Sequence, residues 1–273
     1  MHNLALVIKT YKPDYDRVKL LIESIDKHNS DNIPIYISIN DADYDFFKSN
    51  LTNTKHTLLK DSQICTTSVT DGWRYQQIIK SQFYRLKVAR NYLCIDSDSL
   101  FISDFYIKDF IYNDDVPYTI MQESKPQLEI FERIDVDTVK HSFRTPVKAI
   151  RVIFNLPEVK YWDYGPSPYL WSCKVWESFY EDYLPANNFT IESFFSELDK
   201  TTHPAEALIY GEYLRKTKII EIIPCECFFK VYHYKKQFDI EKKFHNIEKL
   251  KKVYLGVIFQ SNWKQKKKRF KLF

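Results

Sequence analysis

Apolar and polar positions repeat along the first half of the chain in an order that alternates strand and helix. Residues 4–10 form an apolar run that predicts a buried strand, and residues 13–28 then space their apolar side chains like one helical face. Residues 34–40 and 56–60 predict further strands, with a short helix over 41–50 between them. This order predicts an α/β fold whose parallel strands are joined by right-handed crossovers.

The alternation continues into a helix and a strand that ends in two acids. Residues 70–90 begin with Thr-Asp-Gly, a helix start signal, and predict a helix. Its expected buried side chains are Ile78, Ile79, Phe83, Leu86 and Val88. The sequence "NYLCIDSDSLFIS" (91–103) then runs as an apolar strand to Ile95, with Asp96 and Asp98 directly after it. Residues 116–123 predict one more strand.

The second half has longer helical patterns and an aromatic loop. Residues 126–160 predict irregular helical structure, and "YWDYGPSPYLWS" (161–172) predicts a structured loop because it holds one glycine and two prolines. Further helices are expected at 173–184, 189–199, 203–216 and 239–252, and strands at 218–224, 227–234 and 254–261. No break in composition divides the chain, so we expect a single domain with halves 1–123 and 124–263 and a basic tail 264–273.

Charge and hydropathy narrow the class of protein. The chain has 273 residues, 44% of them hydrophobic and 28% charged, as in a globular protein with a full core. Its net charge of +4 is too small to indicate a nucleic-acid partner. Six of the eight residues 264–271 are Lys or Arg, and Leu272 and Phe273 follow them. This tail either contacts an anionic membrane surface peripherally, at the inner face, or is a solvated terminus.

The cysteines and the apolar runs indicate the compartment. Five cysteines are present, an odd number, and Cys94 lies within an apolar strand. Reduced thiols in a cytoplasmic protein are the simplest interpretation. The chain opens without a basic leader before its apolar run, and no apolar stretch reaches the roughly 20 residues of a membrane span, so we expect neither a signal peptide nor a spanning helix.

Asp96 and Asp98 are the strongest chemical signal. In an open parallel sheet ligands gather at the carboxyl ends of the strands, where these acids lie. Ser97 between them is expected to point the other way, so both carboxylates can face one point. Carboxylate oxygens on a short loop suit Mg²⁺ or Mn²⁺, ions that commonly bridge diphosphates. The pattern therefore predicts a divalent metal that holds a diphosphate leaving group; solvated acids at a strand end are the structural alternative.

Two phosphate chemistries place Asp-x-Asp at the end of a strand. "CIDSDSL" resembles the motif of haloacid-dehalogenase-like phosphatases, in which the first Asp is a nucleophile and the second an acid/base. That motif normally opens its domain, whereas at least two predicted strands precede it here. The other users of the motif are glycosyltransferases of the GT-A class, which transfer a sugar from a nucleotide.

Several segments carry a resemblance to one group of those enzymes. "IKTYKPD", "DGWRYQQIIKSQFY" and "YLCIDSDSLFI", with "PAEALIYGEYL" (204–214) and "FQSNW" (259–263), resemble a poorly characterised, bacterial-type GT-A family with Gly-Trp-x-x-Gln-Gln-x-x-Lys and Asp-Ser-Asp motifs. The resemblance implies a Rossmann-like, mixed but mainly parallel sheet flanked by helices, with a helical acceptor-side region. Residues 1–123 would then be the nucleotide-binding half and 124–263 the acceptor-side half.

The same resemblance assigns donor-binding residues. The strand end Lys9, Thr10 and Tyr11 would meet the nucleoside, Tyr11 by stacking on the base, although packing in a turn would also explain that tyrosine. Gln76, Gln77 and Lys80 would line the diphosphate side together with Asp96, and Lys80 would offset its charge. Gln76 and Lys80 lie four residues apart and so share a helix face, which is also a common arrangement on a solvated helix.

The remaining roles have several candidates. A late histidine often completes the metal site in GT-A enzymes, and His233 is the best placed by position, although a strand histidine is more often structural. Transfer with inversion needs a base for the acceptor hydroxyl, for which Glu206, Glu212 and Asp163 are candidates. Transfer with retention needs no dedicated base.

Together these features predict a cytoplasmic, metal-dependent glycosyltransferase. It would move a sugar from a nucleotide-diphosphate donor, and the resemblance implies that the acceptor is a glycan or lipid-linked glycan of the surface-polysaccharide type. A haloacid-dehalogenase-like phosphatase and a nucleotide- or glycan-binding protein without turnover are the alternatives.

Overall fold

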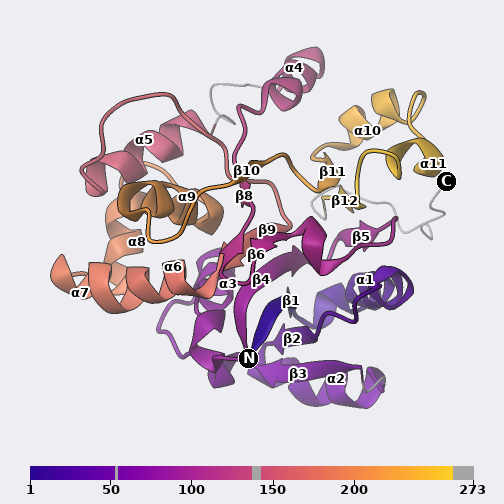
Figure 1. Cartoon of the computed structure of the whole chain (residues 1–273), viewed down its shortest axis with the longest axis horizontal. Coiled ribbons are helices and arrows are strands. Elements are labelled where there is room, and N and C mark those ends of the chain that lie inside the picture. Colours follow the sequence, from indigo (N-terminus) through magenta and orange to yellow (C-terminus); the bar gives the residue numbers. More distant parts are fainter. Residues whose placement is uncertain (53–54, 137–142, 261–273) are drawn as a thin grey trace.

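A five-stranded sheet forms the centre of the molecule. The computed structural model describes residues 1–52, 55–136 and 143–260. The strands lie in the order β3-β2-β1-β4-β9 (Figure 1). The first four are mutually parallel and β9 runs antiparallel to β4. Their bounds are β1 His2–Thr10, β2 Ile35–Ile39, β3 His56–Lys60, β4 Ala89–Asp96 and β9 Tyr169–Ser172.

The central strands are buried on both faces. In β1, Ala5 and Val7 belong to one hydrophobic core, whereas Leu4, Leu6 and Ile8 belong to a second core across the sheet. Because side chains alternate along a strand, a run that is apolar at every position fills both cores at once. This explains why the first predicted strand is continuously apolar.

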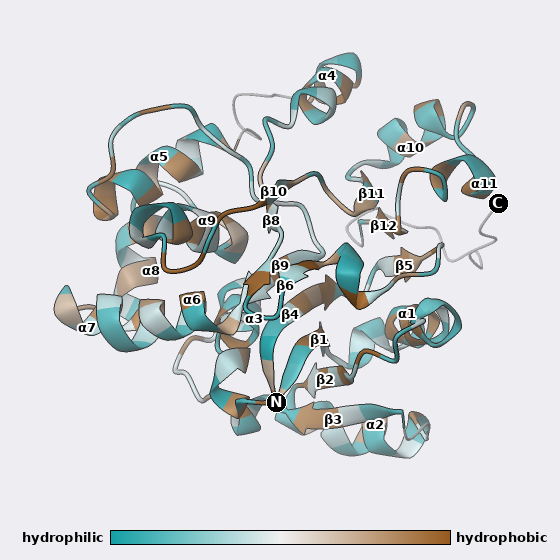
Figure 2. Ribbon diagram, in the orientation of Figure 1, coloured by the Kyte–Doolittle hydropathy of each residue, from teal (hydrophilic) through white to brown (hydrophobic). Residues whose placement is uncertain are grey.

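Helices cover both faces of the sheet. Figure 2 shows that they mix hydrophobic and hydrophilic residues along their length, as expected of helices that bury one face. The first core holds residues of α3, α5, α6, α8 and α9, and the second holds residues of α1 and α2. The helices are α1 Tyr15–His28, α2 Tyr44–Asn50, α3 Gly72–Ser81, α4 Lys125–Arg133, α5 Arg144–Ile153, α6 Cys173–Ser178, α7 Leu184–Ala186, α8 Ile191–Asp199, α9 Glu206–Thr217, α10 Lys235–Glu241 and α11 Ile247–Leu250.

Three small sheets complete the fold. One has the order β11-β12-β5 and joins the strand after the acidic turn to the end of the described chain. Its strands are β5 Ser99–Phe101, β11 Phe229–Tyr232 and β12 Gly256–Phe259. The other two are pairs, formed by β6 Ile111–Asn113 with β7 Val116–Pro117 and by β8 Thr119–Ile120 with β10 Pro224–Cys225. The predicted fold class, an α/β fold with a mainly parallel sheet flanked by helices, is confirmed.

Two predictions about strands are wrong. Residues 116–123 form the two short strands β7 and β8, which pair in separate small sheets and not in the central one. The expected loop 161–172 ends in β9, which joins the central sheet. Leu170 and Trp171 of β9 enter opposite cores, so this short strand is apolar at each position and its pattern shows no alternation.

Three element boundaries also differ from the prediction. The helix expected over 70–90 ends at Ser81, and after a 3₁₀ turn Lys87 takes a left-handed conformation with φ 52°. Of residues 218–224, only Pro224 joins a strand. The helix expected at 239–252 is two short helices, because Asn246 between them caps α11 by accepting a hydrogen bond from the Lys249 amide.

The other predicted elements are present within a few residues of their expected ends. The strand at 56–60 has the predicted bounds, and strands cover the centres of 34–40, 227–234 and 254–261. Helices occupy the predicted segments 173–184, 189–199 and 203–216, with a π-helical turn in the first. Within the described ranges, no helix has both the length and the apolar character needed to cross a bilayer. The basic tail 264–273 lies outside the described residues.

Candidate functional site

A cavity of about 570 Å³ opens at the carboxyl ends of β1 and β4, and we call it the strand-end cavity. Two strand ends, the face of α3 and the start of α9 meet there. Its lining residues are Lys9, Thr10, Tyr11, Asp14, Asn40, Gly72, Trp73, Tyr75, Gln76, Lys80, Asp96, Ser97, Asp98, Tyr169, Ala205, Glu206 and Gln260. The structure therefore brings together most of the donor-binding residues that the sequence predicts, and both acids of the Asp-Ser-Asp motif.

One face of α3 lines this cavity. Trp73, Gln76 and Lys80 follow each other at helical spacing, whereas Gln77 faces away and accepts a hydrogen bond from Arg74 Nη1 at 2.8 Å. The helix begins where Asp71 caps it by accepting from the Arg74 amide at 2.8 Å. The prediction that Gln76 and Lys80 share a face is confirmed, and Gln77 is not a lining residue.

Lys80 lies between two carboxylates. Its Nζ is 2.7 Å from Asp96 Oδ1 and 3.4 Å from Glu206 Oε1, and its side chain is only 4% exposed. Burial opposes the charged form of Lys80, but the attraction of Asp96 and Glu206 outweighs it and holds the Lys80 pKa well above its usual value. The cation that the two acids of the sequence motif require is therefore supplied in part by the protein itself.

Lys9 is held by the protein in the same cavity. Its ammonium group is 2.9 Å from Asp61 Oδ2 and donates to the Thr10 carbonyl at 2.9 Å and to Asn40 Oδ1 at 3.1 Å. These partners use its three N–H donors, and burial lowers its pKa despite the carboxylate of Asp61. Lys9 thus fixes the ends of three strands. Thr10 Oγ1, by contrast, is buried and has no hydrogen-bond partner among the described residues, so it is available to a ligand.

The acidic turn contacts Asp14, a residue that the sequence analysis did not identify. Ser97 lines the cavity instead of facing away from it, and its hydroxyl donates to Asp14 Oδ2 at 2.8 Å. Asp14 Oδ1 in turn accepts from Arg17 at 2.7 Å. Asp14 follows the first strand by a few residues, so its nearness to the end of β1 was the only signal that could have identified it.

The charges around the cavity do not balance. Asp14, Asp96, Asp98 and Glu206 supply four carboxylates against the ammonium groups of Lys9 and Lys80, a formal balance of −2. Arg17 and Asp61, which stand behind Asp14 and Lys9, leave that balance unchanged. Among the described residues no three His, Cys, Asp or Glu side chains form a complete metal cluster. A cation held by Asp96 and Asp98 would therefore need further ligands from water or substrate.

His233 and Asp163 lie at other cavities. The structure does not bring His233 to the strand-end cavity, and its ring packs against Phe131 with centroids 5.5 Å apart. Burial lowers the His233 pKa to about 4, with Lys230 acting in the same direction. Asp163 is buried; it accepts from Ser124 Oγ at 2.5 Å and from the Gly165 amide at 3.1 Å. Burial raises the Asp163 pKa to about 6.

Glu212 is enclosed in an ion network away from any of these cavities. Arg151 donates to both of its oxygens, at 2.8 and 3.0 Å, and Arg215 and the Tyr164 hydroxyl reach the same carboxylate at 3.2 and 2.8 Å. The side chain of Glu212 is fully buried. A Cβ on the neighbouring Gly211 would lie 2.2 Å from ring atoms of Tyr164, so only glycine permits this contact. Glu212 ties α9 to α5 and has no free oxygen for a substrate.

The comparisons with known proteins give one family and a distant structure. A family model described as "Family of unknown function (DUF6492)" matches residues 3–145. Among solved structures, the apo-form glycosyltransferase GlyE of Streptococcus pneumoniae TIGR4 matches with a TM-score of 0.48 and 10% identity, over 94% of this chain and 54% of that one. The chain thus spans about half the length of that protein. A search of curated proteins gave no match.

Proposed function

This chain belongs to DUF6492, a family of unknown function, and we propose from its strand-end cavity that it is a metal-dependent glycosyltransferase. The donor would be a nucleotide-diphosphate sugar, and the acceptor a glycan or lipid-linked glycan. The observation that carries the proposal is the charge of the cavity: four carboxylates surround two buried ammonium groups at the carboxyl ends of parallel strands.

A surplus of negative charge determines which anion can enter. A diphosphate alone would be repelled by a cavity with a formal balance of −2, whereas a diphosphate that carries Mg²⁺ or Mn²⁺ would not. Asp96 and Asp98 would hold the ion, and these two acids fit an ion that keeps water and phosphate oxygens among its ligands. When bound, the ion would stabilise the negative charge that develops on the leaving diphosphate.

Lys80 forms ion pairs with two carboxylates. It contacts Asp96 and Glu206 in this structure; if Asp96 held the ion, Glu206 would still position the Lys80 ammonium group to donate to a phosphate oxygen. Its raised pKa keeps the ammonium charged throughout. Glu206 therefore positions Lys80, and its ion pair makes it a poor base for an acceptor hydroxyl.

Exposed aromatic side chains suit the nucleoside. Tyr11 is 44% exposed and Trp73 is 42% exposed although both line the cavity, which leaves their ring faces open for stacking on a base. Asn40, Gln76 and the unpartnered hydroxyl of Thr10 add hydrogen-bonding groups for a ribose or base.

In a transfer with inversion, Asp163 would take the proton of the acceptor hydroxyl, whose oxygen bonds to the anomeric carbon as the diphosphate leaves.

We place this activity in the cytoplasm. The cysteines Cys65, Cys94, Cys173, Cys225 and Cys227 are all free thiols, as in a reducing compartment. Contact of the basic tail with the inner membrane face belongs to the same proposal, because an acceptor linked to lipid would be presented there.

Release of nucleoside diphosphate tests the proposal. The protein would be incubated with a panel of UDP-, GDP- and dTDP-sugars with Mn²⁺, with Mg²⁺ and with EDTA. We expect metal-dependent release of a nucleoside diphosphate from at least one donor, slowed about 100-fold or more in Asp98→Asn. Asp45→Asn, on the exposed side of α2, is the matched control and should behave as the wild type.

Two outcomes would overturn the assignment. Orthophosphate released from simple monoesters, with every donor left intact, would indicate a phosphatase. Metal-dependent nucleotide binding without turnover of any donor, also with a lipid-linked acceptor present, would indicate a binding protein.

A further inference from the structure

Two more cavities adjoin the strand-end cavity. The first, of about 680 Å³, shares Tyr169 and Ala205 with it, and we call this the middle cavity. The second, of about 610 Å³, shares Ser124, Gln127, Pro166 and His233 with the middle cavity, and we call this the distal cavity. Each has the volume of a site for a drug-sized ligand, about 300–1,000 Å³. The three cavities thus follow one another across the face of the molecule.

The aromatic loop 161–169 runs along all three. Tyr169 lines the strand-end and middle cavities, Asp163 the middle one, Pro166 the middle and distal ones, and Trp162 the distal one. A single segment therefore forms a continuous wall. Gln122 fixes this wall, because its backbone pairs with that of Asp163 and its side chain donates to the Gly165 carbonyl at 2.8 Å.

The distal cavity has both apolar and polar lining residues, and its charges balance. Glu123 and Glu226 supply two carboxylates against the ammonium groups of Lys125 and Lys230. Glu123 and Lys125 form an ion pair at 3.2 Å, and Lys230 pairs with Glu241 at 2.6 Å. An anionic ligand would have to displace Glu123 or Glu241 from these lysines, so the cavity favours an uncharged ligand over an anionic one.

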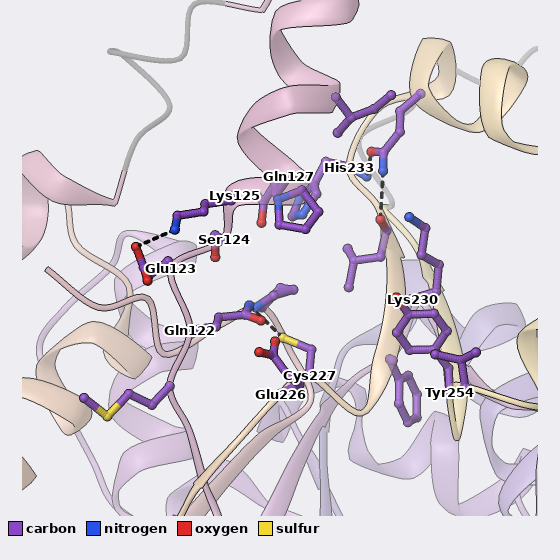
Figure 3. A pocket seen from close by; sticks show the side chains of 18 of the residues that line it. Gln122, Glu123, Ser124, Lys125, Gln127, Glu226, Cys227, Lys230, His233 and Tyr254 are labelled. Atoms are coloured by element: carbon purple, nitrogen blue, oxygen red, sulfur yellow. Dashed lines mark hydrogen bonds and ion pairs between the residues drawn. The ribbon is translucent and has the colours of Figure 1, made fainter.

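Beside apolar side chains such as Met121, Ile130 and Phe229, the lining offers amides and aromatic rings, the groups that bind hydroxyl groups and sugar rings. Figure 3 shows Gln122 and Gln127 on one side of the distal cavity, with Lys230 and Tyr254 facing them. Amides both donate and accept hydrogen bonds, and the rings of Trp162 and Tyr254 offer apolar faces with a polar edge. The cavity does not resemble a nucleic-acid surface, because its two lysines are paired with glutamates and leave no surplus of cations.

We propose that the middle and distal cavities bind an uncharged oligosaccharide, which lies along the aromatic loop and presents a hydroxyl to Asp163. Asp163 accepts from Ser124 and from the Gly165 amide and makes no ion pair with any residue that the structure describes, so its oxygens remain able to accept from a sugar. That the oligosaccharide is the acceptor of transfer rests on the proposed function; that it binds here does not.

Ligand-observed NMR with defined glycans tests the site. The probes are uncharged hexose disaccharides and hexasaccharides, and hexuronic-acid oligosaccharides of the same lengths, added to the full chain at millimolar concentration. We expect the uncharged hexasaccharides to bind more tightly than the disaccharides, because they reach both cavities, and the charged series not to bind. Trp162→Ala and Gln127→Ala should each weaken binding about tenfold, whereas Tyr112→Ala, an exposed aromatic outside the three cavities, should not.

Several results would overturn the inference. They are binding by no uncharged glycan, preference for the charged series, or binding unchanged in both Trp162→Ala and Gln127→Ala when their melting temperatures match the wild type. Asp98→Asn separates this inference from the proposed function. If the wild type binds no uncharged glycan but binds nucleotide in a way that Asp98→Asn abolishes, the glycan site alone is refuted. If it binds glycans but its nucleotide binding does not depend on Asp98, the transferase alone is refuted.

Discussion

Two glutamates on α9 lie six positions apart and are both buried, yet they lie in opposite electrostatic settings. Glu212 has two arginines and a tyrosine hydroxyl around one carboxylate. Glu206 shares the single ammonium of Lys80 with Asp96. The first carboxylate is fully neutralised, which is what a structural contact requires; the second is under-neutralised and faces a cavity. Burial alone therefore does not distinguish the two acids, but the number of cations around each one does.

The largest predicted effect is the difference in unfolding free energy between variants of the two glutamates. Glu212→Gln leaves Arg151 buried without its charge partner and should lower the free energy of unfolding by about 3–5 kcal/mol. Glu206→Gln leaves Lys80 with Asp96, so the change should stay within about 1 kcal/mol. Urea denaturation of both variants at pH 7 measures this difference. Equal losses would remove the distinction on which the comparison depends.

Asp163 extends the comparison to a buried carboxyl group with no cation among the described residues. Its folded pKa of about 6 lies above that of an unfolded aspartate, so the stability that its protonated form contributes is present below about pH 4 and is lost as the pH rises to 6. Relative to Asp163→Asn, the wild type should lose about 3 kcal/mol of unfolding free energy between pH 4 and pH 7.

The measurement is a pair of urea titrations at each pH, one for the wild type and one for the variant. Only the difference between the two proteins counts, because other groups titrate in both. A difference that stays constant with pH would mean that Asp163 is ionised throughout.

Removing the positive charge of Lys80 tests whether this cation offsets the carboxylates of the strand-end cavity. Lys80→Met makes the strand-end cavity more negative, so Mn²⁺ alone should bind more tightly while a nucleoside diphosphate with Mn²⁺ should bind about 10–100-fold more weakly. Isothermal titration calorimetry measures both affinities, and Lys48→Met, on the exposed side of α2, is the control. If both affinities moved in the same direction, Lys80 would not be the internal counter-ion of Asp96.

The sequence predicts the first half of the fold well because its signals are local. Alternation, helix spacing and turn residues define β1 to β4 and the helices between them. The strand β9 could not be predicted, because Leu170 and Trp171 are buried on both faces and follow a proline-rich segment. The prediction of a strand over 218–224 was wrong for a related reason: most of the apolar residues of this segment pack without a partner strand.

The candidate site divides in the same way. Residues at strand ends and on one helix face, such as Thr10, Gln76 and Asp98, could be placed from position and spacing. The two glutamates could not be told apart, because their partners are distant in sequence: Arg151 lies 61 residues from Glu212 and Lys80 lies 126 residues from Glu206. Position predicts which side chains meet at a strand end, but the cations that meet each acid depend on the tertiary fold.

The close contact at Gly211 has a consequence beyond α9. Tyr164, whose ring fills the space that a methyl group would need there, is also part of the segment that forms one side of the three cavities. A bulkier residue at 211 would push that ring outward and carry Asp163 and Gly165 with it. The shape of the proposed sugar site would then depend on the missing Cβ at position 211 of α9, a residue that does not line the site.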